Sequence, residues 1–481
     1  MALFSESSNL LKRNLLIPRS LLMKSALSKR DEKFLEKSLN GTMWKVILMI
    51  GTPLALYQGL QQIFSILDTM MAAHISKESV SAVAYLSQLN HLLSAVGGGL
   101  AVGAGIQISR AFGEGDLELV HKRVSTLYAI SFSVGMAMLG IILPFTGQFL
   151  KLAGTPETLI AVGTRYFIVQ LFTMVVQFLN NVYIAVERAR GNAGRIFRLN
   201  LGVIALKLSL TAVFVYILNG DLFMIGLASL ISQVFLLTFA FRNSFFDQGV
   251  FGFSLKAVSA EGKVVGPMLK RSWPVITEKA LFSFGKTIVN SMCTLYGDTM
   301  VGAMGVSNNL GGFTTNPQNG YQEGAASIIS QNLGAGKHKR VLEAFKAVLI
   351  VNIIIGAVFS SIELWQLDFL ASLFDSGSME FHNMIMTVYR FEALGAVPLG
   401  INASVMALLY GLGETRLTMI INLARVFVFR IPVFWFLQNC TDFGQASVGI
   451  VMMVSNVSVA VLSSFIAWIV IRNFRKTYII A

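Results

Sequence analysis

The sequence predicts an all-α integral membrane protein with twelve transmembrane helices in two lobes of six, related by a pseudo-two-fold axis along the membrane normal. Its 481 residues are 54% hydrophobic and 13% charged, whereas soluble domains carry about 25% charged residues. Apolar runs of about 20 residues, long enough to span a bilayer, recur along the whole chain. The chain also resembles itself after a shift of 221 or 222 residues.

This internal repeat is carried by short blocks at equivalent places in the two halves. The matched residues are Pro53 with Pro274, Ile108-Ser109 with Ile329-Ser330, Gly113 and Gly115 with Gly334 and Gly336, Asn180 with Asn402, Gly191 with Gly413, and Asn200-Leu201 with Asn422-Leu423. A membrane chain with two like halves in one orientation commonly places a binding cavity between them. The repeat therefore indicates a transporter.

The predicted helices are continuous apolar runs, unlike the short alternating segments of a membrane β-barrel. They lie at 44–70, 80–106, 124–149, 158–184, 199–218, 222–241, 273–295, 301–328, 345–367, 384–409, 417–438 and 447–471. The repeat divides the chain into five parts. These are a basic cytoplasmic segment at 1–42, an N-lobe at 43–242, a cytoplasmic linker at 243–271, a C-lobe at 272–472 and a cytoplasmic tail at 473–481.

The formal net charge of +13 reflects topology. Twenty-seven Lys and Arg residues lie in the termini and the even-numbered connections, and two lie in the odd-numbered ones. The positive-inside rule then predicts a multi-pass cell-membrane protein with both termini cytoplasmic, and no nucleic-acid partner. Residues 1–42 lack the apolar core of a signal peptide. Two interpretations are open: these residues form a basic amphipathic stretch on the inner leaflet, or they form a disordered tail.

The sequence contains no motif that indicates catalysis. Gly113-x-Gly115-Asp116 matches the GxGD signature of intramembrane proteases, but it lies in a charged turn and its second copy ends in Lys337. Glycine-mediated helix ends, which need a positive φ, explain both copies better. The chain has no Walker A motif and no histidine spacing suited to a metal. We therefore expect no enzyme, no cofactor and no metal, and transport driven by an ion gradient.

Several motifs resemble those of the multidrug and toxic compound extrusion (MATE) family, of bacterial type. They are Pro53 with Asp68-Thr69, Arg190-Gly191-Asn192, Gln331-Asn332-Leu333-Gly334-Ala335-Gly336 and Gly411-Leu412-Gly413-Glu414-Thr415-Arg416. The similarity covers roughly residues 44–472. The resemblance implies two six-helix lobes, a central cavity open alternately to each side, and export coupled to inward H⁺ or Na⁺.

Asp68 is the main candidate for ion coupling. A carboxylate inside a spanning helix costs several kcal/mol unless it faces protein or water, so it suggests function. The resemblance assigns the matching Asp a role in cation or proton coupling. The alternative is that the first helix ends near residue 68 and Asp68 is solvated at the outer surface. Pro53 and its counterpart Pro274 each remove a helix hydrogen bond and are candidate hinges, although a static packing kink would look the same.

Lys207 and Thr211 stand where archaeal members of the family carry Asn and Asp in the fifth helix. Lys207 lies about 14 Å into its predicted helix at 1.5 Å per residue, too deep to reach the surface readily. An Asp68–Lys207 ion pair would satisfy both charges and would sense proton load. A purely structural pair, or two groups that face water separately, are the other interpretations. A lysine here disfavours Na⁺.

Five further residues are candidates for the substrate cavity: Asn180, Asn181, Asn402, Glu278 and Lys286. The three Asn residues occupy matched positions in the two halves, where buried amides can equally serve only to bond helices together. A Lys286–Glu392 contact is another possibility, and Arg425 could instead extend to the lipid headgroups.

We interpret the chain as a secondary antiporter that exports amphiphilic organic compounds, with H⁺ favoured over Na⁺ and Asp68 as the coupling carboxylate. Its partners would be small-molecule substrates, H⁺ or Na⁺ and the lipid bilayer, and we expect a monomer. The main alternative is a flippase for a lipid-linked oligosaccharide or another anionic lipid-like substrate, because Lys207, Lys286, Arg425 and Arg430 could hold a pyrophosphate.

Overall fold

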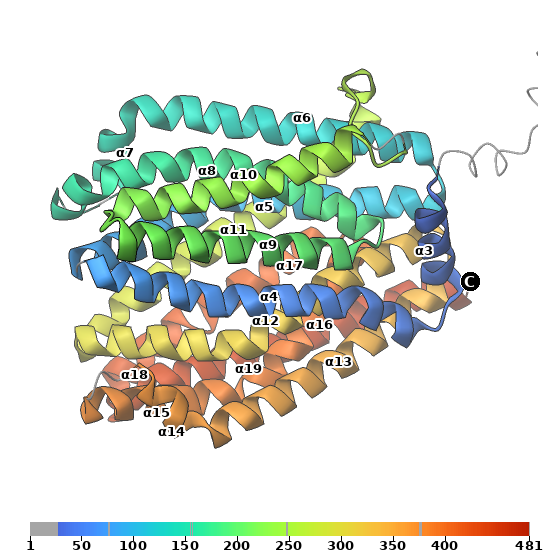
Figure 1. Cartoon of the computed structure of the whole chain (residues 1–481). Coiled ribbons are helices and arrows are strands. Elements are labelled where there is room, and N and C mark those ends of the chain that lie inside the picture. The colour runs from blue at the N-terminus through green and yellow to red at the C-terminus, as the bar shows by residue number, and fades with distance from the viewer. Residues whose placement is uncertain are drawn as a thin grey trace, which may run out of the picture.

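The fold is a bundle of long helices that run roughly parallel to one another (Figure 1). The computed structural model describes the backbone of residues 27–75, 77–153, 155, 157–246, 249–374 and 378–480, and their side chains except at 64–66, 68–75, 77–85, 158–159, 161–162, 298 and 480. A short helix, α3 (Lys29–Asn40), lies across one end of the bundle, near the carboxyl terminus (Figure 1). We call this the α3 end.

Six long segments form the N-lobe. They are α4 (Met43–Ile75), α5 (Lys77–Glu114), α6 (Leu117–Ile142) continued by η1 (Leu143–Phe145) and α7 (Thr146–Leu152), α8 (Glu157–Ala189), α9 (Ala193–Ala212) continued by η2 (Val213–Ile217), and α10 (Leu222–Phe245). The described part of the connection to the C-lobe contains one 3₁₀ turn, η3 (Leu255–Ala257).

Six more long segments form the C-lobe. They are α11 (Gly262–Cys293) ending in η4 (Thr294–Tyr296), α12 (Asp298–Gly334), α13 (His338–Trp365) followed by α14 (Leu367–Ser372), the pair α15 (Met379–Leu394) and α16 (Ala396–Leu412), the run α17 (Thr415–Leu423), η5 (Ala424–Val428) and α18 (Ile431–Cys440), and α19 (Ala446–Arg475) with η6 (Lys476–Ile480). The predicted fold class of twelve segments in two lobes is confirmed.

The structure differs from the sequence prediction mainly at the helix ends. α11 begins at Gly262, within the segment 243–271 that we expected to be linker, and α5 and α12 run on to Glu114 and Gly334. Backbone hydrogen bonding continues where the apolar run stops, so hydropathy underestimates helix length. The glycine turns behave as predicted, because Gly115 and Gly336 have φ of 74° and 70°.

Two of the long helices are too polar to pass as simple membrane spans. Among the described residues, nine helices are long and apolar enough to cross a membrane, or ten if α15 and α16, bent by 47°, count as one span. α11 and α12 do not qualify. They pack against α5 and α4 of the N-lobe, so much of their surface faces protein and the space between the lobes. Their polar residues are therefore candidates for function.

Small residues let the two lobes approach closely. A Cβ atom on Gly99 of α5 would lie 2.7 Å from the backbone nitrogen of Ile276 on α11. On the other pair of helices, a Cβ atom on Gly320 of α12 would lie 2.5 Å from the backbone nitrogen of Ala55 on α4. Close backbone contact through glycine is a common way to pack helices in membranes.

Candidate functional site between the lobes

The two copies of the repeated motif pack against each other near the α3 end. A Cβ atom on Gly113 would lie 2.0 Å from the carbonyl oxygen of Gln331, and one on Gly334 would lie 2.2 Å from that of Arg110. The Ser109 and Ser327 hydroxyls are 3.0 Å apart. The repeat therefore supplies the surfaces that hold the lobes together at this end.

An ion pair also links the lobes at this level. Arg188, near the end of α8, donates to Glu323 on α12. The pair lines a cavity of about 60 Å³ between α5, α11 and α12, together with Lys279 and Tyr410. The contacts between the lobes at the α3 end therefore lie next to this small polar cavity.

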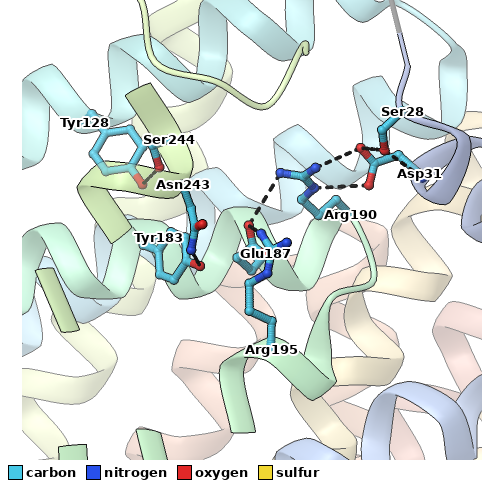
Figure 2. A network of polar contacts seen from close by, with 9 residues as sticks. All are labelled: Ser28, Asp31, Tyr128, Tyr183, Glu187, Arg190, Arg195, Asn243 and Ser244. Atoms are coloured by element: carbon cyan, nitrogen blue, oxygen red, sulfur yellow. Dashed lines mark hydrogen bonds and ion pairs between the residues drawn. The ribbon is translucent and has the colours of Figure 1, made fainter. Parts of the chain in front are cut away.

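Figure 2 shows the network that ties α3 to the N-lobe. The Arg190 guanidinium donates to both carboxylate oxygens of Asp31, at 3.1 and 2.9 Å. It also lies 3.5 Å from Glu187, which accepts from Arg195 at 3.4 Å. Phe34 of α3 is buried against Gly191, where the φ of 79° and the lack of a Cβ make room for its ring.

The other end of α3 is bound to the C-lobe. Ser38 donates to the side chain of Gln331 at 2.7 Å, and Arg340 donates to the carbonyl oxygen of Gly41 at 2.8 Å. Gln331 in turn donates to the carbonyl oxygen of Ala189 in the N-lobe at 2.7 Å. Residues 29–40 therefore form a protein-bound helix that bridges the lobes. For these residues the structure differs from both interpretations of segment 1–42, since Phe34 and Ser38 of α3 are buried against protein, and residues 1–26 lie outside the described residues.

The proposed coupling residues lie on neighbouring helices. Asp68 belongs to α4, but its side chain lies outside the described residues. α4 packs against α9, which carries a half-buried Lys207 and, one turn later, Thr211 with 0% exposure. The Thr211 hydroxyl has no hydrogen-bond partner among the described residues. The helix of Asp68 thus packs on the helix of Lys207 and Thr211, and the ion site and an Asp68–Lys207 contact stay predictions.

The two candidate hinges lie inside continuous helices. Pro53 is in α4 and Pro274 is in α11, where it is buried. α4 and α11 contact α12 and α5 of the opposite lobe, so a bend in either would move the interface. A hinge role stays a prediction.

Glu278 is enclosed by hydrogen-bond donors within the C-lobe. It is only 5% exposed and accepts from Tyr410 at 2.8 Å, Thr418 at 2.9 Å and Asn422 at 2.6 Å. These donors come from α16 and α17, so the carboxylate joins three helices. The predicted cavity residue thus faces the interior of its own lobe.

The three Asn candidates occupy different environments. Asn180 is buried and donates to the backbone and side chain of Gln233 on α10, at 3.0 and 2.9 Å. Asn181 is half-buried. Asn402 is buried, and its side-chain oxygen lacks a hydrogen-bond partner in the part of the chain that the structure describes. The contacts of Asn180 are those of a residue that packs helices together.

Lys286 lies in a cation-rich region with Arg425 and Arg430. The predicted Lys286–Glu392 ion pair is absent from the described side chains, because Glu392 instead accepts from Ser307 at 2.5 Å. Lys286 and Arg430 line a second cavity of about 180 Å³, and Gln88 of the N-lobe also lines it. Arg425 does not extend to the headgroups, since it donates to Asn456 at 2.8 Å.

Sequence reasoning missed a buried carboxylate on α13. Glu363 accepts from Thr314 of α12 at 2.9 Å and from the Tyr389 hydroxyl of α15. A carboxylate near the end of an apolar run looks like a loop residue in the sequence. The signal available was that Glu363 falls inside the predicted segment 345–367.

Known proteins resemble this chain in sequence. The family model described as MatE matches residues 53–217 and 274–436, and the two matches begin at the paired prolines. The probable multidrug resistance protein YoeA of Bacillus subtilis is 23% identical over 335 residues, covering 67% of this chain and 72% of YoeA. The multidrug export protein MepA of Staphylococcus aureus is 25% identical over 320 residues, covering 65% and 67%.

Solved structures show the same fold. A crystal structure of MATE in complex with MaL6 has a TM-score of 0.88 at 18% identity and covers 94% of this chain and 100% of that one. An outward-facing multidrug resistance MATE family transporter of the MOP superfamily has a TM-score of 0.87 at 18% identity, covering 91% and 98%.

Proposed function

Because this chain belongs to the MatE family, we propose that it is a secondary active antiporter exporting amphiphilic organic compounds in exchange for H⁺. The observation that carries the proposal is the polar space between two like lobes, bounded by α11 and α12 and closed at the α3 end by lobe-to-lobe bonds. Alternating access needs such a space, with a closure that can be released.

The compounds are inferred from the relatives. YoeA and MepA are named as multidrug resistance and export proteins. The 180 Å³ cavity combines Val289, Val301, Met304 and Met452 with charged and amide side chains. Such a mixture suits amphiphilic molecules, because methionine adapts to ligands of different shape.

Coupling to H⁺ is proposed for Asp68. The packing of α4 on α9 supports this, because it brings the helix of Asp68 against the helix of Lys207. A lysine ammonium would repel Na⁺ from a shared site but would stabilise an ionised carboxylate. Proton binding to Asp68 would then change the charge balance of the N-lobe.

Gradient-driven transport by the purified chain in proteoliposomes tests this function. An imposed pH gradient should drive accumulation of a fluorescent amphiphile, and an Na⁺ gradient of the same size at constant pH should not. Transport that follows only the Na⁺ gradient would overturn the choice of ion. Absence of transport of every amphiphile under both gradients would overturn the function.

A flippase for an anionic lipid-linked substrate is the second candidate. The observation that favours it is the cluster of Lys286, Arg425 and Arg430, which could hold a pyrophosphate. Movement of a lipid-linked pyrophosphate between leaflets without any ion gradient would favour this candidate over the antiporter.

The orientation is also a proposal. The α3 end carries the basic connections, so we place it and both termini in the cytoplasm, in a multi-pass cell-membrane protein that acts as a monomer.

A further inference from the structure

We propose that the 180 Å³ cavity lined by Lys286 and Arg430 binds the acidic group of an amphiphilic anion, which makes anionic amphiphiles the substrate class of this exporter. The inference rests on the proposed function and deepens it, since that function leaves the charge of the substrate open. It is carried by an excess of positive charge in the wall of one cavity and beside it.

Two lysines of α11 face the space between the lobes. Lys279 and Lys286 are seven residues apart, two turns of helix, and therefore share a face. A Cβ atom on Gly98 of α5 would lie 3.8 Å from the Lys279 ammonium, and Lys286 shares its cavity with Gln88 of α5. Both side chains are exposed, and neither forms an ion pair or hydrogen bond with the described residues.

The charges around Lys286 do not balance. Lys286 and Arg430 line one cavity, Arg425 and Arg430 donate to the same Asn456 oxygen, and Glu392 is the carboxylate near these three cations. Glu392 accepts its hydrogen bond from Ser307 and forms no ion pair with the described cations. Arg430 is 3% exposed, and within the described part of the chain it donates to two neutral acceptors, Ser455 at 3.1 Å and Asn456 at 3.3 Å.

Two unpaired hydrogen-bond donors also lie close to Arg430. The buried Nε of Arg425 and the buried side-chain nitrogen of Asn456 have no acceptor among the described residues. The Asn456 oxygen already accepts from both arginines. A carboxylate, sulfonate or phosphate brings acceptors and negative charge, so it complements the positive charge of Lys286 and Arg430 in the cavity wall. An organic cation would add to that positive charge.

The remaining walls are suited to an apolar group. Val289, Val301, Met304 and Met452 line the same cavity. The Phe282 ring lies beside the site, with the Lys286 ammonium 5.8 Å and the Arg425 guanidinium 5.6 Å from its centroid. A buried arginine that forms no ion pair is costly in a membrane domain, so Arg430, which forms none with the described residues, points to a ligand that supplies negative charge.

Paired probes test the inference. The purified full chain in detergent is titrated with pyrenebutyrate and with pyrenebutyl-trimethylammonium, which share an apolar group and differ in charge. The anion should bind at least about tenfold more tightly, as expected when one charged hydrogen bond is gained. Equal or tighter binding of the cation overturns the inference.

Variants assign the binding to this cavity. Lys286→Gln should weaken pyrenebutyrate binding about tenfold or more and leave binding of the cationic probe unchanged. Lys286→Arg, which keeps the positive charge, should bind pyrenebutyrate as the unaltered chain does. Lys256→Gln, which removes an exposed charge from the linker, is the matched control and should change nothing. Unchanged anion binding by Lys286→Gln overturns the assignment. Because Lys286 is exposed, this test does not depend on whether Arg430→Gln folds.

Competition separates the sources of the acidic group. A free amphiphilic carboxylate that displaces pyrenebutyrate, when a polyprenyl pyrophosphate in mixed micelles does not, supports a soluble organic anion. The reverse result supports a lipid headgroup, and both outcomes keep the anionic class. Binding does not require transport, so a failed gradient experiment would remove the antiporter proposal while these titrations still decide the charge of the ligand.

Discussion

Arg188 of α8 and Glu323 of α12 form an ion pair between the two lobes, and the pair lines the cavity of about 60 Å³. Their side chains are 10% and 29% exposed, so both are partly removed from water. In the proposed alternating access, opening at the α3 end would separate these residues. The pair therefore belongs to the closure at the α3 end.

Loss of this pair should favour opening at the α3 end. We expect Arg188→Gln to destabilise the closed arrangement by about 2 kcal/mol, between the values for exposed and buried pairs. Ser327→Cys, in a chain whose Cys293 and Cys440 are replaced by Ser, should then react faster with a water-soluble maleimide. Lys122→Gln, which removes an exposed i,i+4 pair, is the control. Unaltered reactivity would show that the pair does not hold the closure.

Fixing α3 to the C-lobe should stop transport. Ser38 and Gln331 bridge α3 and α12, and α3 is also bound to the N-lobe through Asp31 and Arg190. Cross-linking Ser38→Cys to Gln331→Cys with a cleavable bifunctional thiol reagent should abolish pH-driven export. Cleaving the bound reagent should restore export. Ser94→Cys with Gln177→Cys, a pair inside the N-lobe, is the control. Full transport by cross-linked protein would mean that α3 need not release.

Asp68→Asn should abolish export driven by an imposed pH gradient, because Asn cannot exchange a proton. Protein level in the membrane should be unchanged. Asp221→Asn, at an exposed helix start on the far end from α3, is the matched control and should retain transport. Full pH-driven export by Asp68→Asn would remove the coupling role.

Tyr410→Phe should destabilise the C-lobe. The Tyr410 hydroxyl donates to the buried carboxylate of Glu278, and a hydrogen bond to a charged group contributes about 1.5–3 kcal/mol. We expect a lower thermal unfolding temperature in detergent. Tyr296→Phe, in the η4 turn, is the control and should unfold like the unaltered chain. Identical unfolding of both variants would show that this hydrogen bond adds no net stability.

The site could be predicted only in part. Lys286 and Glu278 stood out because charges are rare inside apolar segments, and the structure places both in the C-lobe interior or its cavity. Their partners could not be predicted. Glu278 bonds to residues 132 to 144 positions away, and such contacts leave no periodic signal in a sequence. The expected Lys286–Glu392 pair failed for the same reason.

The role of α3 also could not be predicted from the sequence. Its charges are those of an ordinary basic tail, yet Asp31 contacts a residue 159 positions away and Ser38 one 293 away. No local pattern distinguishes a helix that docks on protein from one that lies on lipid. Only the positions of Arg190 and Gln331 in the folded lobes decide it.

The sequence by itself determined that this protein has two like membrane lobes, twelve long helices and glycine turns at matched places. These follow from hydropathy, charge asymmetry and internal repetition, which are local or periodic properties of the chain. The tertiary structure alone decided which charges meet across the lobes, which carboxylate is enclosed by donors, and which cavity has excess positive charge. These depend on side chains brought together from distant helices, and their energies arise only when water is removed from the contact.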